Sequence, residues 1–337
     1  MLDSQSFVRF LMQLGLAITG ATSLWSFVLY YLARKSKDKM RAENLWKLAN
    51  LPFPLFVAGV LLFVGSWVLL ENIFSPALSS AHEGIAVKAT EDYIRNGLAA
   101  TAPFVSLLIF CVLFIAWVRR ARKKFFKKYN ILLFGLCFAL VSVIASLILF
   151  VDSFNTLQIF YFLHHWHSIF TLGTVIVVDY FFFRTAKHQP IKAVLYPLFP
   201  LFSIVIWSGL GIDFLSNLLI FEEAFTVNSK FLFVQTVIAI IILNGTLLSQ
   251  RINDKLIKSV ELTNPLPVSQ KMQNVFGFSG SVSIISWLTI TFVDVFTFNL
   301  KYWQFSAYYL LAIIFAFVIH LLMRKRLDVF QVHKTAQ

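Results

Sequence analysis

Two acidic side chains interrupt long apolar runs of this sequence. Asp179 precedes Tyr180 and a basic end at Arg184, and Asp294 lies near the end of a later run. A carboxylate inside hydrocarbon costs a few kcal/mol, so such acids mark an ion or proton site, or a counter-charge for a cationic substrate. The alternative is a structural acid, and for Asp179 the neighbouring Tyr180 and Arg184 could satisfy the carboxylate.

A histidine and an asparagine extend this polar set. His320 lies in the last apolar run, about a turn before Arg324, at a depth comparable to that of Asp179. If their helices touch, the two side chains would form a carboxylate–imidazole pair able to handle protons; otherwise His320 is a lone histidine near the interface. Asn244 precedes Gly245 in another apolar run, where it either lines the same path or bonds two helices together.

Three histidines cluster at the start of one apolar run. His164 and His167 are three residues apart, so they lie on neighbouring faces of one helix, with His165 between them. Together with Met12 or His82 they could bind copper. Haem would require two histidines at one depth on facing helices, a non-histidine ligand or a second subunit. The other interpretation is a polar and aromatic cap at the membrane interface.

The composition defines the elements that must position these groups. Of the 337 residues, 58% are hydrophobic and 13% are charged, whereas about a quarter are charged in soluble domains. Runs of roughly 20 apolar residues span a bilayer, so we predict an all-α integral membrane protein with about nine transmembrane helices. The predicted spans are 8–32, 52–72, 98–118, 131–151, 162–183, 194–220, 231–249, 278–299 and 302–323.

The basic residues predict the orientation. The loops that follow the first, third, fifth, seventh and ninth spans lie on one side of the membrane, and they contain nearly all of the lysines and arginines. The exceptions on the other side are Arg9, Lys88, Arg95, Lys230 and Lys301. Basic loops face the cytoplasm, which places the N-terminus outside and the C-terminus in the cytoplasm of a plasma (inner) membrane. The net charge of +13 therefore contacts anionic lipids at the cytoplasmic face rather than nucleic acid.

The chain also contains an internal repeat. Phe53-Pro54-Leu55-Phe56 recurs as Phe199-Pro200-Leu201-Phe202, and at the same offset Gly65 matches Gly211. Four spans return the chain to its starting side, so two such units would be parallel repeats. We predict a first four-helix repeat over 1–151, a second over 152–300, and a ninth helix with a cytoplasmic tail over 301–337. Pro197 and Pro200 are expected to kink the sixth span.

The region from the fifth to the seventh span resembles a group of bacterial membrane proteins that includes the copper-resistance D-type family. The matching residues are His164 or His165, Gly173, Asp179, Phe181 to Arg184, Lys230-Phe231 and Asn244-Gly245. This resemblance implies copper handling or another metal or redox role at the outer face. The chain departs from it in having 5 methionines in all, few for a dedicated copper pathway.

Three functional hypotheses follow. No P-loop, GxSxG, HExxH or dinucleotide motif is present, which argues against an enzyme. The first hypothesis is transport of an ion or small solute, with Asp179, His320, Asn244 and Asp294 along the path. The second is a redox subunit that binds copper or haem through His164, His165 and His167. The third is a structural or assembly partner of a membrane complex, or a homo-oligomer. Cys111 and Cys137 are expected to be packing residues.

Overall fold

The computed structural model describes residues 4–70, 85–120, 129–149, 156–185, 189–224, 229–247, 270–296 and 300–327. Over these residues the chain is almost entirely α-helical and has no strand. The helices are α1 (Ser4–Lys35), α2 (Lys39–Asn50), α3 (Phe53–Leu69), α5 (Ile85–Arg120), α6 (Asn130–Leu149), α7 (Thr156–Thr185), α8 (Gln189–Leu195), α9 (Phe199–Ala224), α10 (Ser229–Leu247), α12 (Gln270–Val295) and α13 (Tyr302–Leu327).

The predicted all-α architecture is confirmed, and it is consistent with an integral membrane protein. Within the described residues, seven helical segments are long and apolar enough to cross a membrane. They are Ser4–Lys35, Lys39–Leu69, Ala100–Arg119, Asn130–Leu147, Pro190–Ile212, Ser229–Leu247 and Tyr302–Leu322. Two shorter apolar stretches, Ile169–Phe182 and Gly277–Val293, lie in α7 and α12.

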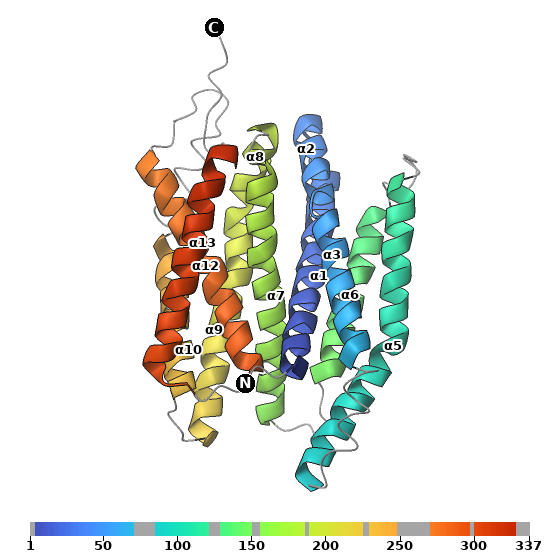
Figure 1. Ribbon diagram of the computed structural model, residues 1–337. Coiled ribbons are helices and arrows are strands. Elements are labelled where there is room, and N and C mark those ends of the chain that lie inside the picture. The colour runs from blue at the N-terminus through green and yellow to red at the C-terminus, as the bar shows by residue number, and fades with distance from the viewer. Residues whose placement is uncertain are drawn as a thin grey trace.

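The long helices run side by side, and α7 lies at the centre of the bundle (Figure 1). α1, α3, α5 and α6 lie on one side of α7 in this view, and α9, α10, α12 and α13 lie on the other. The short helices α2 and α8 pack against each other at one end of the bundle, where α13 also ends. We call this the α2/α8 end; α1 begins at the opposite end.

Small residues allow α1 to lie against three neighbours at once. α1 packs extensively on α3, α6 and α7. A Cβ atom added at Gly15 would lie 2.8 Å from the Phe63 Cα atom of α3, and one added at Gly20 would lie 2.8 Å from Phe170 Cε1 of α7. Helix association within lipid depends on such close packing, so these glycines place α1 at the core.

Hydroxyl groups on α1 are satisfied without separating the helices. Thr19 donates to the Gly15 carbonyl at 2.7 Å, and Ser23 donates to the Thr19 carbonyl at 2.8 Å. Between helices, Trp25 Nε1 donates to Thr174 Oγ1 of α7 at 3.0 Å. Buried polar atoms need such partners where water is excluded, and the last of these bonds joins α1 directly to α7.

Several element boundaries differ from the sequence prediction. α5 begins at Ile85, so part of the expected long loop before the third span is helical, as its alanine-rich sequence allows. The expected kink in the sixth span is instead a 3-10 turn, Tyr196–Leu198, that contains Pro197 and separates α8 from α9. Pro200 occupies the first turn of α9, where its missing N–H group is not needed.

Candidate intramembrane polar site

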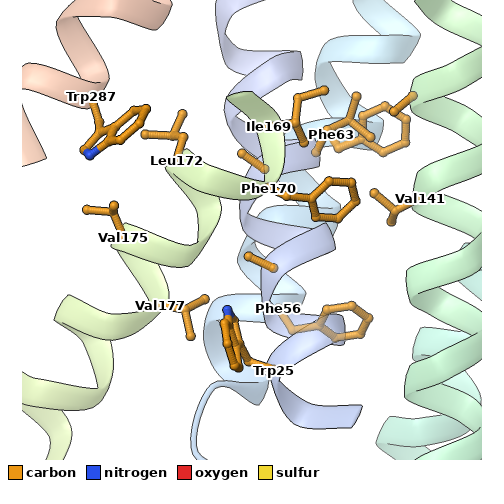
Figure 2. Close-up of a cluster of buried hydrophobic side chains, with 14 of the residues drawn as sticks. Trp25, Phe56, Phe63, Val141, Ile169, Phe170, Leu172, Val175, Val177 and Trp287 are labelled. Atoms are coloured by element: carbon orange, nitrogen blue, oxygen red, sulfur yellow. The ribbon is translucent and has the colours of Figure 1, made fainter. Parts of the chain in front are cut away.

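Asp179 lies on the face of α7 that is directed away from α1. Leu172 and Val175 on this face lie beside Trp287 of α12 (Figure 2), and Asp179 follows them by seven and four residues, which keeps it on the same helical stripe. The side chain is partly exposed in the isolated chain. Within the described residues the Asp179 carboxylate makes no hydrogen bond or ion pair, so neither Tyr180 nor Arg184 satisfies it.

Asp179 of α7 and Gly280 of α12 lie at a similar position along the axis of the bundle. α7 and α12 run in opposite directions (Figure 1). Asp179 lies about 10 Å further along α7 than Leu172, and Gly280 lies the same number of residues before Trp287 on α12. The carboxylate is therefore at the depth of Gly280. A Cβ added at Gly280 would meet no atom within 4 Å, which leaves open space beside this glycine.

His320 lies against the same part of α12. A Cβ atom added at Gly277 would lie 2.7 Å from His320 Cε1, and closer still to Nε2. The imidazole also stacks on Phe317 of its own helix, with ring centroids 6.4 Å apart. The glycine thus provides the space that the ring occupies. No ion pair joins His320 to Asp179 in the described part of the chain, so the structure does not contain the predicted direct carboxylate–imidazole pair.

Asn244 of α10 is held by a reciprocal interaction with Ser279, two residues after Gly277 on α12. Its Nδ2 group donates to the Ser279 carbonyl at 2.9 Å, while Ser279 Oγ donates to Asn244 Oδ1. The adjacent Gly245 faces Trp207 of α9, whose ring carbon Cζ2 would lie 3.4 Å from an added Cβ atom. Of the two sequence-based interpretations of Asn244, the structure provides direct geometry for the bond between helices.

Two of the predicted path residues therefore contact one segment of α12, and a third lies at a similar depth on α7. His320 covers Gly277, Asn244 bonds to Ser279, and Asp179 is level with Gly280. The sequence analysis missed Gly277 and Ser279. The run of glycine and serine from Gly277 to Ser283 was the available signal, because small residues mark places where neighbouring helices approach closely.

The other predicted site residues remain largely outside the described side chains. This applies to Asp294, His164 and His165. His167 is partly exposed, and its neighbour Trp166 packs on Phe170 with ring centroids 4.6 Å apart. Among the side chains that are described, no group of three metal-binding residues is present, so the copper or haem hypothesis is untested by the geometry.

Comparison with known proteins gives no relative from which a function could be transferred. No protein-family model matches the chain, and neither a curated protein nor a solved structure is significantly similar to it.

Proposed function

We propose that this protein is a nine-span plasma (inner) membrane transporter that moves a cation or small solute past Asp179. The nine spans are the seven long apolar segments together with α7 and α12. Support for adding these two comes from their apolar stretches Ile169–Phe182 and Gly277–Val293, and from their antiparallel course inside the bundle (Figure 1).

The charge distribution supports an N-outside, C-inside orientation. α1 ends in Arg34 and Lys35, and α7 has Arg184 in its last turn. The basic helix α2 and Lys192 of α8 lie at this same end of the bundle. Because positive residues are enriched in cytoplasmic segments, the α2/α8 end faces the cytoplasm.

Reciprocal contacts between α1 and α7 support two parallel four-helix repeats. Gly20 of α1 faces Phe170 of α7, and Gly173 of α7 faces Ala17 of α1. Ala17 precedes Gly20 by three residues, just as Phe170 precedes Gly173. A two-fold axis between equivalent helices produces this kind of exchanged contact, which supports treating α1 and α7 as equivalent elements.

The order of elements supports the same correspondence. α1 continues into the short helix α2 and then α3, which begins with Phe53-Pro54; α7 continues into α8 and then α9, which begins with Phe199-Pro200. α5 packs on α6, and α10 packs on α12. In this scheme α13 is the additional ninth helix.

The two repeats differ most where Asp179 lies. α6 packs along α1 extensively, whereas α12, its counterpart, touches α7 at fewer residues. On the spacing that aligns Gly20 with Gly173, Asp179 corresponds to Ser26, which is 1% exposed. A packed position in one repeat thus corresponds to a partly accessible carboxylate in the other.

The observation that carries the transport proposal is a carboxylate on an apolar helix that has no partner among the described residues. An ionisable group in such a place is costly and is kept where it serves an ion or solute path. Asp179 supplies the charge, while His320 and Asn244 hold the facing α12 segment in place. Asp294 remains a sequence-based candidate for the outer part of the path.

The test is flux through the full chain in proteoliposomes. Protons would be followed with an internal pH dye and monovalent cations with ion-selective dyes, under an imposed gradient. Asp179→Asn keeps the side-chain size and removes the charge, so flux of the transported cation should fall at least tenfold. Glu43→Gln is the matched control, because Glu43 is an exposed carboxylate paired with Lys47 at 2.9 Å. Equal flux through the wild-type, Asp179→Asn and Glu43→Gln proteins would remove Asp179 from the mechanism.

A further inference from the structure

A polar cluster at the α2/α8 end joins four helices and plays no part in the proposed path. Tyr30 Oη and Arg119 Nη1 both donate to Asn50 Oδ1 at 2.6 Å, and Arg119 Nη2 lies 3.5 Å from the Asn50 carbonyl oxygen. Asn130 Nδ2 donates to Tyr30 Oη at 3.3 Å. The Arg119 guanidinium also lies 4.3 Å from the centroid of the Phe53 ring. One side of this cation is therefore fixed by neutral groups.

Arg119 has no acidic counter-charge among the residues that the structure describes. Within the described residues its polar partners are the Asn50 side chain and backbone, and no carboxylate pairs with it. The sequence contains no acidic residue between Asp92 and Asp152, and a strongly basic stretch runs from Arg119 to Lys128. A guanidinium has five N–H donors, so most of them remain available. A half-buried cation in this state favours an anion from outside the chain.

The adjacent N-terminal end of α6 also favours binding of an anion. α6 begins at Asn130, and the first N–H groups of a helix have no partner within it and carry partial positive charge. Asn130 is itself buried, with 6% relative exposure, and its Oδ1 atom has no hydrogen-bond partner. The site thus combines several donors for an anion with one buried acceptor that requires a donor.

Exposed aromatic side chains give the depth of this cluster. Trp117, two residues before Arg119, is 51% exposed, and Tyr129, directly before Asn130, is 39% exposed. Tryptophan and tyrosine favour the headgroup region of a bilayer. In a membrane, the group that carries both a phosphate anion and a nearby hydroxyl donor at this depth is a phospholipid headgroup.

We propose that Arg119, Asn130 and the first turn of α6 bind the phosphate of an anionic phospholipid whose headgroup also carries hydroxyl groups. The phosphate accepts from the free Arg119 donors and from the α6 N-terminus, and a headgroup hydroxyl donates to Asn130 Oδ1. This binding site is independent of transport through Asp179.

The experiment measures lipid binding by the detergent-purified full chain. Native mass spectrometry would measure retention of phosphatidylglycerol, and thermal unfolding would measure stabilisation by added phosphatidylglycerol, phosphatidylcholine or inorganic phosphate. We expect retention and stabilisation by phosphatidylglycerol in preference to phosphatidylcholine, and no comparable effect of inorganic phosphate. Equal effects of the two lipids would contradict a site selective for an anionic, hydroxyl-bearing headgroup, and equal protection by inorganic phosphate would show that the ligand is not a lipid.

Two variants of Arg119 and one control separate a specific site from general surface attraction. Arg119→Gln should weaken phosphatidylglycerol binding by about tenfold or more, and Arg119→Lys, which keeps the charge and loses the forked donor geometry, should give an intermediate loss. Arg34→Gln removes an exposed charge at the same end and should cost no more than about fivefold. If Arg34→Gln and Arg119→Gln weaken binding equally, the site does not exist; Arg119→Lys maintains this comparison if the glutamine variant does not fold.

Discussion

The contact between α1 and α7 predicts a large effect from a single methyl group. Gly173→Ala places a Cβ atom 2.7 Å from both the Ala17 carbonyl carbon and Ala21 Cβ, and closer still to the Ala17 carbonyl oxygen. Ordinary van der Waals contact begins near 3.4 Å. The obstructing atoms include backbone, which cannot rotate away as a flexible side chain can. The helices must therefore separate by about 0.7 Å or more.

A gap of this size forfeits about a quarter to a half of each dispersion contact along the affected interface. Overpacking of a filled core typically costs about 1–3 kcal/mol, and the better helix propensity of alanine returns up to about 1 kcal/mol. Separation would also weaken the Trp25–Thr174 hydrogen bond of 3.0 Å, which crosses the same interface. We expect Gly173→Ala to lower the free energy of unfolding by about 2 kcal/mol.

The assay is reversible unfolding of the purified protein in mixed micelles of increasing denaturing-detergent content, followed by helical circular dichroism. Gly211→Ala is the matched control, because a Cβ atom added there meets nothing within 4 Å; it should leave stability unchanged or slightly increased. The reasoning about α1 and α7 is refuted if the two alanine variants unfold at the same detergent content.

Two further predictions concern other helix pairs. Gly277→Ala should destabilise the protein because its methyl group overlaps the His320 ring, and His320→Ala should relieve that overlap. A double-mutant cycle measured by the same unfolding assay should therefore show a favourable coupling of roughly 1 kcal/mol between the two substitutions. Strictly additive effects would contradict this packing. Cys111 of α5 and Cys137 of α6 are free, buried thiols in hydrogen-bond contact. A membrane-permeant diazene oxidant should therefore join them in an intrachain disulfide, and the intact mass of the protein should fall by two hydrogens. The Cys111→Ser protein should show no such loss.

The sequence predicted helix positions best where the thickness of the membrane sets the length of an apolar segment. The need for about 20 apolar residues per crossing located the long helices to within a few residues for α3, α6, α10 and α13. It gave no comparable signal for the short helices α2 and α8, which are too short and too polar to register as spans. Asp38 provided a local signal for α2, because its side chain accepts from the Met40 and Arg41 N–H groups and caps the helix.

The sequence indicates which polar residues lie within apolar helices, but it does not indicate which residues they contact. Asp179, Asn244 and His320 were identified because polar groups are costly in apolar helices. Their partners depend on helix rotation, which a single sequence with little amphipathic patterning does not define. His320 therefore contacts Gly277 instead of Asp179, and Asn244 is bonded to Ser279. Glycine and serine make these contacts through their small size, a property that composition alone cannot distinguish from incidental occurrence.

The proposed repeat explains why Asp179 occurs on α7 and has no acidic counterpart on α1. Both helices use one face for their mutual contact, and that face retains small residues such as Gly20 and Gly173. The face that meets α6 in one repeat and α12 in the other is not similar in the two repeats. Where the contact with α6 is extensive, the position equivalent to Asp179 is the fully buried Ser26. Where the contact with α12 is sparse, the equivalent position is the partly exposed Asp179, and partial exposure lowers the cost of placing a carboxylate there. In the proposed scheme, the looser contact between α7 and α12 thus provides the space that an acidic transport site requires.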